Sequence, residues 1–390
     1  MTIKSSGSSL SFSEIESEFG SNPGRSLGQY RSTDSNFQNK NLGALSNLPL
    51  DTGIPVSGQI KFSDFYSKKL NLVVDYFDDT GSSGGQANNV LNREDDGANT
   101  MAATWRYNNQ SSRVRVVGGY RSRPTGTLSG TYNLSSTAWG GGKKVFIHVN
   151  KSVGGQKASG DAGTKNRVAL RTGGWPSGTS LQIDIGSSGR IQGAGGNGRQ
   201  GATSSGTPSP AFTGTSGLGI EYPAQINNSG IIRCGYGGGG GGAGSWSDPN
   251  KNPRDFGRSG GGGGGGAGIP VGFGGPQNTG GYGTVGGNSP SSQAGKGKAG
   301  TDATFDNNGT GGDGGNHGEG GGEAGDGGNG GDRNDSAQSG DAGSPNRGAG
   351  GSPGSNGHGI IFSSSSVQNN SSGNKTLSSS DGGVIVGGVA

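Results

Sequence analysis

Apolar residues near the start of the chain follow a helical pattern. Three of them lie at intervals of three or four residues: Phe12, Ile15 and Phe19. This spacing predicts a short helix that ends at Gly20. Ser13 is the expected N-cap, because Glu16 three residues later completes a capping-box pattern.

A second group of apolar residues occurs in a short alternating run before residue 67. Its members are Ile60, Phe62, Phe65 and Tyr66. The first 66 residues contain few other apolar positions, so they are expected to bury little surface by themselves and to fold against a partner. We interpret residues 1–66 as an N-terminal module.

Residues 67–195 change to an all-β pattern. Strand-like runs rich in β-branched and aromatic residues alternate with clusters of Gly, Asn, Ser or Pro. The runs are Leu70–Phe77, Thr104–Tyr107, Val114–Tyr120, Thr127–Leu134, Lys144–Val149, Arg167–Arg171 and Ser180–Ile185. In Lys144–Val149 the three residues Val145, Ile147 and Val149 share one face. Short strands with regular turn signals predict a β-sandwich or jelly roll.

Two later stretches resemble each other. Ile185–Gly193 and Ile226–Ile232 each hold an apolar residue, a polar turn closed by glycine, and a return to isoleucine. The segments Gly359–Phe362 and Val384–Val386 near the end of the chain also have strand-like composition. A glycine-rich body with β-like ends is therefore expected over residues 196–390.

Glycine follows a three-residue period in this last region. The positions on one register are Gly309, Gly312, Gly315, Gly318, Gly321, Gly327, Gly330, Gly348, Gly351, Gly354 and Gly357, with Ala324 in place of one glycine. Such a period fits extended helices with three residues per turn that pack too closely for a Cβ on one edge.

Polyglycine II-type helices suit this period better than collagen does. Collagen requires proline or hydroxyproline at the other two positions, whereas residues 309–357 contain only Pro345 and Pro353. Dense hydrogen bonds between segments would have to offset the large conformational entropy that glycine loses. A flexible glycine linker is the alternative, but Asn, Asp, Arg and Ser are scattered here without repetition.

The composition of the chain excludes several classes of protein. Only 25% of the 390 residues are hydrophobic and 92 are glycine, which excludes one conventional core along the whole chain. The net charge of +4 is spread out, so we expect no nucleic-acid partner. The single cysteine, Cys234, excludes an intrachain disulfide framework. We expect neither a membrane span nor an ordinary signal peptide, because no long apolar run is present.

Catalytic and metal-binding patterns are weak. The acidic residues of the glycine-rich region (Asp313, Glu319, Glu323, Asp326 and Asp332, with His317 among them) offer oxygen ligands for Ca²⁺. They lack the aliphatic residue that follows the aspartate in calcium-binding repeats. Paired carboxylates for glycan hydrolysis could come from Asp75, Asp78, Asp79, Glu94, Asp95 or Asp96, but turn-like surroundings favour a solvent-facing role. We expect no metal, no cofactor and no enzymatic activity.

Aromatic residues are the candidate binding residues of the glycine-rich region. Rigid aromatic faces supply large contact areas at low entropic cost. The candidates are Tyr236, Trp246, Phe256, Phe273 and Tyr282. The alternative is that each ring anchors its own loop to a glycine scaffold. Arg254, Arg258, Arg333 and Arg347 are further candidates for contact with anionic polysaccharide.

Two parts of the sequence resemble virion proteins of tailed phages. Gly58–Tyr66, with Leu50–Pro55 before it, looks like a short N-terminal module of such proteins, especially those of marine cyanophages. Ile226–Gly242 (INNSGIIRCGYGGGGGG), the later glycine tracts and Gly359–Phe362 are similar to glycine-rich tail-fibre and tail-tip proteins. Adhesins of T-even type phages hold such tracts as polyglycine II helices that present variable loops; the spacing of the tracts here is less regular.

The resemblance implies a virion tail protein, assembled in the host cytoplasm, that attaches the particle to the host. Its partners would be other virion tail proteins and a host cell-surface glycan or outer-membrane protein, without membrane insertion. A homo-oligomer such as a trimer is compatible with a fibre, although no heptad repeat is present. The expected virion-docking residues are the apolar residues of the N-terminal module: Phe12, Ile15, Phe19, Ile60, Phe62, Phe65 and Tyr66. A head fibre, decoration protein or baseplate linker is the structural alternative, and a glycan-degrading enzyme is the third.

Overall fold

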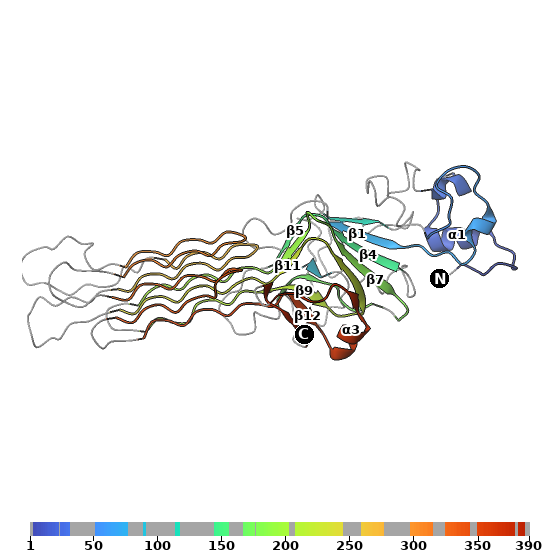
Figure 1. Cartoon of the computed structure of the whole chain (residues 1–390). Coiled ribbons are helices and arrows are strands. Elements are labelled where there is room, and N and C mark those ends of the chain that lie inside the picture. Colours follow the sequence, from blue (N-terminus) through green and yellow to red (C-terminus); the bar gives the residue numbers. More distant parts are fainter. Residues whose placement is uncertain are drawn as a thin grey trace, which may run out of the picture.

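A computed structural model of the chain shows a helical N-terminal module, three sheets and a long glycine-rich body (Figure 1). The structure describes residues 3–22, 24–31, 51–76, 89–90, 114–117, 144–155, 167–175, 177–202, 207–244, 259–276, 297–314, 324–343, 349–378 and 381–386. Within these residues no helix is long and apolar enough to cross a membrane.

The N-terminal module contains helix α1 (Phe12–Phe19) and two 3-10 helices, η1 (Leu27–Tyr30) and η3 (Phe62–Phe65). The helix ends at Gly20 as expected, but its N-cap is Ser11 and not Ser13. Ser11 accepts a hydrogen bond from the N–H of Glu14, and the Glu14 carboxylate accepts one from the N–H of Ser11 (2.8 Å). This cap is two residues earlier because Phe12 itself belongs to the helix.

An aromatic cluster forms a small core inside this module. The rings of Phe19, Tyr30 and Phe65 lie 5.8–5.9 Å apart between centroids, and all three are fully buried. The expectation that residues 1–66 bury little surface alone was wrong, because η1 brings Tyr30 between the two groups of apolar residues.

Three sheets follow the module, and their strands pair mainly in parallel. The first sheet has the order β13-β10-β7-β4-β1-β3, the second β11-β8-β5 and the third β14-β12-β9-β6-β2. The strands of the first sheet are β13 (Ser372–Gly373), β10 (Ala224–Asn228), β7 (Ser180–Ile185), β4 (Lys144–Val149), β1 (Leu72–Tyr76) and β3 (Val114–Val117). The second comprises β11 (Ile231–Arg233), β8 (Arg190–Gln192) and β5 (Ser152–Gly154). The third comprises β14 (Val384–Val386), β12 (Ile360–Phe362), β9 (Ser216–Ile220), β6 (Val168–Arg171) and β2 (Asn89–Val90).

Successive strands visit the three sheets in turn, so the chain forms stacked three-sided coils. One coil is β4-β5-β6, the next β7-β8-β9 and the third β10-β11-β12. Only the pair β1–β3 is antiparallel among the described pairings. The expected β-sandwich or jelly roll is therefore not the arrangement found, although the mainly β composition is confirmed. Helix α3 (Ser365–Asn370) lies between β12 and β13.

The core lies inside the coils, where equivalent residues stack in register. Val145 pairs with Leu181, Ile147 with Ile183 and Val149 with Ile185, and all six are buried. The predicted single face of Val145, Ile147 and Val149 is confirmed. β4 and β7 have the expected bounds, whereas β1 and β6 begin later than their predicted runs. β3 covers the part of its predicted run that the structure describes. The expected strands Thr104–Tyr107 and Thr127–Leu134 lie outside the described residues.

The two similar stretches of sequence occupy the same corner of neighbouring coils. Both join the first sheet to the second, one in β7-β8 and the other in β10-β11. The N–H of Ser229 donates to the carbonyl oxygen of Ile185 (2.9 Å), and the N–H of Ile231 donates to that of Gly189 (3.0 Å). The strands after this corner continue the sheets past residue 195, so the glycine-rich segments leave the coils as two excursions, residues 193–215 and 234–359.

Candidate functional site

The glycine body consists of ten described segments that run side by side (Figure 1). Five run away from the sheets: residues 193–202, 235–244, 271–276, 308–314 and 336–343. Five run back: residues 207–215, 259–269, 297–303, 324–332 and 349–359. Each excursion begins after a strand of the second sheet and ends before a strand of the third.

Backbone hydrogen bonds join these segments every three residues. The N–H groups of Gly196, Arg199 and Ala202 donate in turn to the carbonyl oxygens of residues 236, 239 and 242, at 2.8–3.1 Å. The glycine register read from the sequence behaves in the same way. Gly351, Gly354 and Gly357 donate to residues 241, 238 and 235. The three-residue period is therefore the period of the hydrogen bonds between segments.

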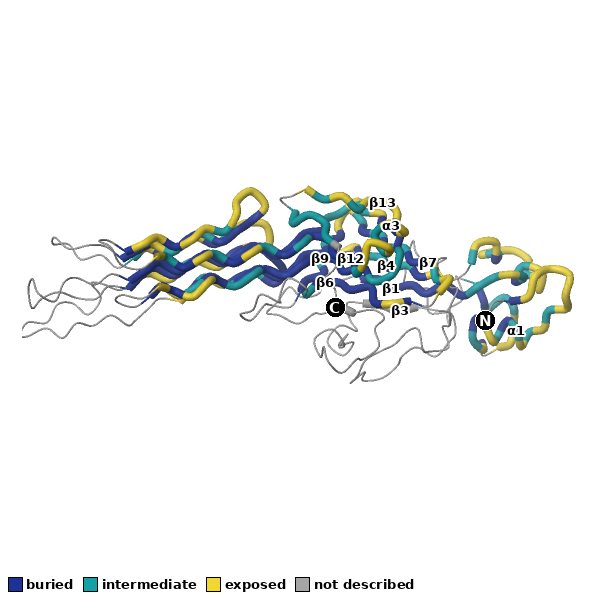
Figure 2. The backbone as a smooth tube through the Cα atoms, turned by 90° about the horizontal axis from the view of Figure 1, so that it is seen from below, coloured by how far each residue is buried: buried dark blue, intermediate teal, exposed yellow. Residues whose placement is uncertain are grey.

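Two segments lie at the centre, and each is hydrogen bonded to six neighbours. Segment 235–244 donates to segments 207–215, 259–269 and 336–343 and accepts from 193–202, 324–332 and 349–359. Segment 259–269 is bonded to 193–202, 235–244, 271–276, 297–303, 308–314 and 324–332. Figure 2 shows buried backbone along the middle of this body and exposed backbone at its rim.

This packing explains the two uninterrupted glycine runs. Gly237–Gly242 and Gly260–Gly266 are the runs in the two central segments. A Cβ on Gly239 would lie 1.9 Å from the carbonyl oxygen of Gly328, and one on Gly264 would lie 2.0 Å from that of Gly309. With neighbours on every side, no position of these two runs has room for a side chain.

Peripheral segments need glycine only on the side that faces a neighbour. In segment 308–314 the residues Gly309 and Gly312 are buried, whereas Thr310 and Asp313 are exposed. A Cβ on Gly312 would lie 2.3 Å from the carbonyl oxygen of Lys298. The spaced glycines and the pure runs thus mark the rim and the centre of one body.

Ion pairs fix the glycine body to the coils at its near end. The Asp306 carboxylate lies in the turn after segment 297–303 and binds Arg190 of β8 and Arg233 of β11, the latter at 2.8 Å. Arg233 also binds Asp381 at 2.8 Å. Partial burial alone would raise the pKa of Asp306, but the hydrogen bond from Arg190 and the charges of both arginines outweigh it and lower the pKa.

The far end of the body is where the outward segments give way to the returning ones. There Ala202 donates to Gly242 (2.9 Å), Gly242 to Gly261 (2.8 Å) and Gly261 to Gly325 (3.0 Å). Five intervals outside the described residues separate the outward segments from the returning ones. The described residues that flank each interval lie at this end. The intervals are residues 203–206, 245–258, 277–296, 315–323 and 344–348. The N-terminal module lies at the opposite end of the molecule (Figure 1).

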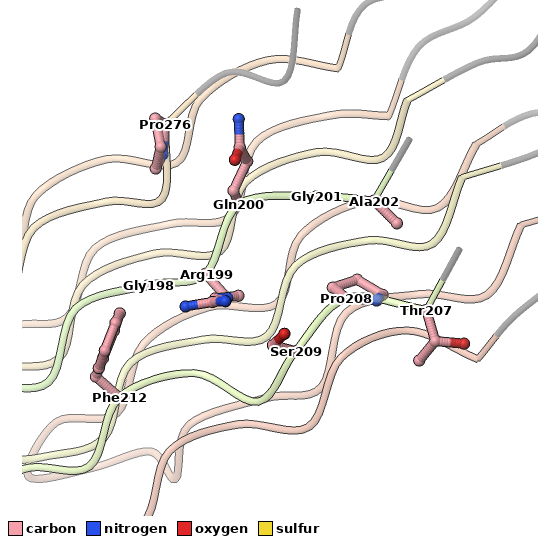
Figure 3. Close-up of a pocket in the computed structure, with 10 residues that line it drawn as sticks. All are labelled: Gly198, Arg199, Gln200, Gly201, Ala202, Thr207, Pro208, Ser209, Phe212 and Pro276. Carbon is pink, nitrogen blue, oxygen red and sulfur yellow. The ribbon is translucent and has the colours of Figure 1, made fainter. Parts of the chain in front are cut away.

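An open groove of about 490 Å³ lies on the side of the body near this end (Figure 3). It is formed mainly by residues 198–202 and 207–212, with Pro276 at its margin. The Arg199 guanidinium carbon lies 5.5 Å from the centre of the Phe212 ring. A guanidinium at this distance is attracted to the face of an aromatic ring. The sequence analysis missed both residues, although Phe212 stands between small and polar residues as the other candidate aromatics do.

The five aromatic receptor-binding candidates have different environments. Phe273 is exposed, with 47% of its surface accessible, on segment 271–276. Tyr236 is buried beside Cys234 at the near end of the body, in the kind of environment that the anchoring alternative describes. Trp246, Phe256 and Tyr282 lie outside the described residues. Of the arginines, Arg333 is exposed in the turn after segment 324–332, and the other three lie outside the description.

The virion-docking candidates divide between the core and the surface of the N-terminal module. Ile15, Phe19 and Phe65 are fully buried, and Tyr66 donates its hydroxyl to the carbonyl oxygen of Ser8 (2.5 Å). Phe62 is exposed at 41%. The remaining two, Phe12 and Ile60, are half-buried.

The acidic residues considered for Ca²⁺ do not gather in the part of the chain that the structure describes. Asp313 pairs with Lys298 (2.6 Å), and Asp326 accepts a hydrogen bond from the N–H of Gly314 (2.6 Å). Asp332 accepts from the N–H groups of residues 334 and 335 and so closes a turn. His317, Glu319 and Glu323 lie outside the described residues, as do the hydrolysis candidates other than Asp75, which pairs with His148 (3.1 Å).

Comparisons with known proteins give one distant likeness. No protein-family model and no curated protein matches the sequence. Among solved structures, the chain is similar to the gp37–gp38 adhesin tip complex of the long tail fibre of bacteriophage S16. The TM-score is 0.33 and the sequence identity 17%, over 94% of this chain and 95% of that chain.

Proposed function

We propose that this chain is a tail-fibre or tail-tip protein of a tailed phage and that it attaches the particle to the host cell by non-covalent binding. The observation that carries the proposal is the placement of five intervals at one end of a rigid body, opposite the N-terminal module. An elongated molecule whose N-terminal module lies at one end and whose glycine body extends to the other suits docking at the first end and attachment at the second.

The three parts take different roles in this proposal. The N-terminal module docks to other virion tail proteins, with Phe62 and the half-buried Phe12 and Ile60 as contact residues. The coiled sheets are a stem. The glycine body is a bundle of polyglycine II-type helices, supported by its three-residue hydrogen-bond period and its six-neighbour central segments.

The far end of the glycine body contacts the host surface. Trp246, Phe256 and Tyr282 belong to the intervals whose flanking residues lie there, and Phe273 is exposed on an adjoining segment. The described backbone that carries Phe273 is fixed by hydrogen bonds, which lowers the ordering cost of binding through that ring. Several copies per virion would convert weak contacts into avidity. The binding partner is a host cell-surface glycan or an outer-membrane protein.

Binding of the purified full chain to host cells tests the proposal. A fragment limited to residues 190–390 is unsuitable, because β9 pairs with β6 and β10 pairs with β7, and both partner strands precede residue 190. We expect saturable binding that competes with adsorption of intact phage. Alanine at Trp246, Phe256 and Tyr282 should weaken this binding, whereas Phe62→Ala at the opposite end should leave it unchanged. A folded chain that neither binds cells nor blocks adsorption would be a structural virion component instead. Release of oligosaccharides from host polysaccharide would contradict the non-covalent mechanism.

A further inference from the structure

The groove beside Arg199 has the features of a prepared binding site on the side of the glycine body. Its two walls, residues 198–202 and 207–212, are neighbouring peripheral segments (Figure 3). The N–H of Phe212 donates to the carbonyl oxygen of Asn197 (3.1 Å), which joins the walls. The space of about 490 Å³ is open to solvent along one side.

Both side chains that dominate the groove project from a fixed backbone. The N–H of Arg199 donates to the carbonyl oxygen of Gly239 (3.1 Å), and the carbonyl oxygen of Arg199 accepts from the N–H of Gly263 (2.8 Å). Phe212 in turn accepts from the N–H of Gly238 (3.0 Å). The central segments therefore hold the backbone under the groove, and the Phe212 ring restrains the guanidinium. Little side-chain freedom remains to be lost on binding.

The charge in the groove is not neutralised by the residues around it. No aspartate or glutamate is among the ten residues that line it. Three buried or half-buried arginines elsewhere in the described chain have carboxylate partners: Arg171 binds Glu221 at 3.2 Å, and Arg190 and Arg233 bind Asp306. For Arg199 no carboxylate partner occurs within the described residues. An arginine in this condition presents its planar fork of N–H donors to an incoming carboxylate or phosphate.

The rest of the lining combines small apolar surfaces with amide and hydroxyl groups. Pro208 and the Phe212 ring supply the apolar surface, and Gln200, Thr207 and Ser209 supply polar atoms. A saccharide has the complementary combination of apolar C–H faces and hydroxyl groups. A neutral sugar would leave the guanidinium without an anionic partner, so the lining favours a sugar that carries negative charge.

We propose that this groove binds an acidic saccharide of the host surface, with the carboxylate or phosphate group at Arg199 and the sugar ring against Pro208 and Phe212. This inference rests on the proposed attachment function and assigns a ligand class to a lateral site. The ten residues that line the groove include none of the aromatic receptor-binding candidates, so the chain would bind a glycan through its side as well as a receptor through its tip.

Titration calorimetry of the full chain with three polymers tests the ligand class. The polymers are polygalacturonate, which carries carboxylates, poly(glycerol phosphate), which carries phosphates, and neutral dextran. We expect binding to at least one of the charged polymers and none to dextran, and the charged polymer that binds identifies the source of the anion. Binding should weaken as salt is added, because the pair forms at the surface.

Substitutions at the groove test the site. Arg199→Ala should weaken binding about 10- to 100-fold, the range for a hydrogen-bonded charged partner. Arg199→Lys should recover part of the loss, because a lysine keeps the charge but not the planar fork. Arg25→Ala is the matched control, since Arg25 is an exposed arginine of the N-terminal module at the opposite end of the molecule. Unchanged circular dichroism and hydrogen exchange of residues 235–243 would confirm that Arg199→Ala folds.

Cell binding separates this inference from the attachment function. If Arg199→Ala and wild type bind host cells equally and the polymers bind no better than dextran, the groove proposal fails while attachment stands. If the charged polymer binds through Arg199 but cells are not bound, the groove is supported and attachment fails. Protease treatment of the cells gives the remaining outcome. Loss of the Arg199-dependent binding after that treatment would make the occupant a protein and overturn the saccharide.

Discussion

Gly239→Ala introduces a single methyl group at the centre of the glycine body. The new Cβ would lie 1.9 Å from the carbonyl oxygen of Gly328 and 2.6 Å from its carbonyl carbon. Both contacts are backbone, so no side chain can rotate away. Segment 324–332 must move outward by roughly 1 Å or more to relieve the overlap, since ordinary Cβ contacts lie beyond 3.0 Å.

This movement lengthens or breaks the three hydrogen bonds that join segment 324–332 to segment 235–244. Gly325, Gly328 and Gly331 donate to residues 243, 240 and 237 at 2.8–3.0 Å. A buried backbone group left without a partner costs about 1–3 kcal/mol. The loss of unfolded-chain entropy on replacing glycine by alanine offsets about 0.4–1 kcal/mol. Loss of all three bonds costs about 3–9 kcal/mol, so we expect a net destabilisation of about 2–8 kcal/mol for opening this part of the body.

Hydrogen exchange of the full chain, read by mass spectrometry, measures this local opening. Amides of residues 235–243 should exchange at least about thirtyfold faster in Gly239→Ala, as every 1.4 kcal/mol is a factor of ten. Gly174→Ala is the control, because a Cβ there would meet nothing within 4 Å. Equal protection of residues 235–243 in the two variants would refute the close packing of the central segments.

Two further substitutions and one labelling experiment test other parts of the structure. Ser11→Ala should destabilise the N-terminal module by about 1 kcal/mol through the lost cap, whereas Ser13→Ala should change its denaturation midpoint little; equal effects would contradict the cap at Ser11. Asp306→Asn should loosen the near end of the glycine body at neutral pH by about 1 kcal/mol or less. Because the folded-state pKa of Asp306 is lowered from 3.8, its stabilisation is present above that value and lost as the pH falls through the folded-state pKa. Thermal midpoints of the variant and wild type should therefore converge in acid; a constant difference would remove the ion pair as the cause. Burial, aided by the charge of Asp381, raises the pKa of Cys234 to about 12, so iodoacetamide at pH 8 should label the chain only after denaturation, and rapid labelling of the native protein would contradict the buried thiol.

Helix α1 and its end at Gly20 could be predicted from the sequence. The sequence did not decide, however, whether Ser11 or Ser13 is the N-cap. Ser11 and Ser13 are each followed three residues later by a glutamate, Glu14 and Glu16. Packing decides between them. With Ser11 as the cap, Phe12 lies within the helix, where its ring is 6.0 Å from Tyr30 and 6.4 Å from Phe62.

The composition of the strands did not show how they pair. Alternation as in Lys144–Val149 places side chains on two faces but is the same for parallel and antiparallel neighbours. The available signal was the similarity of Ile185–Gly193 and Ile226–Ile232, which are the same corner of successive coils. A third corner at Val149–Gly154 lacks the glycine before the returning strand, and this hid the repeat.

The glycine register predicted the hydrogen-bond period but not the neighbours of each segment. The spacing of glycines in one segment shows which edge must be free of Cβ atoms. The hydrogen-bond partners, however, lie in segments that are distant in the sequence, such as 207–215 and 349–359. The candidate site was predicted only in part. Phe273 is exposed as expected, but Tyr236 anchors the junction, and the groove at Arg199 needs two segments that the sequence does not show to be adjacent.

The glycine-rich segments run alternately away from the sheets and back towards them. This arrangement determines which insertions and deletions the protein can accept during its evolution. One extra residue inside segment 259–269 would turn every later side chain by a third of a turn and drive Cβ atoms into neighbouring carbonyl groups. Three extra residues would restore the facing but shift the partners by one repeat. Insertions of any length at the far end, between residues 244 and 259 for example, leave every described hydrogen bond in register. New recognition sequences can therefore be exchanged at that end while the body that carries them stays constant.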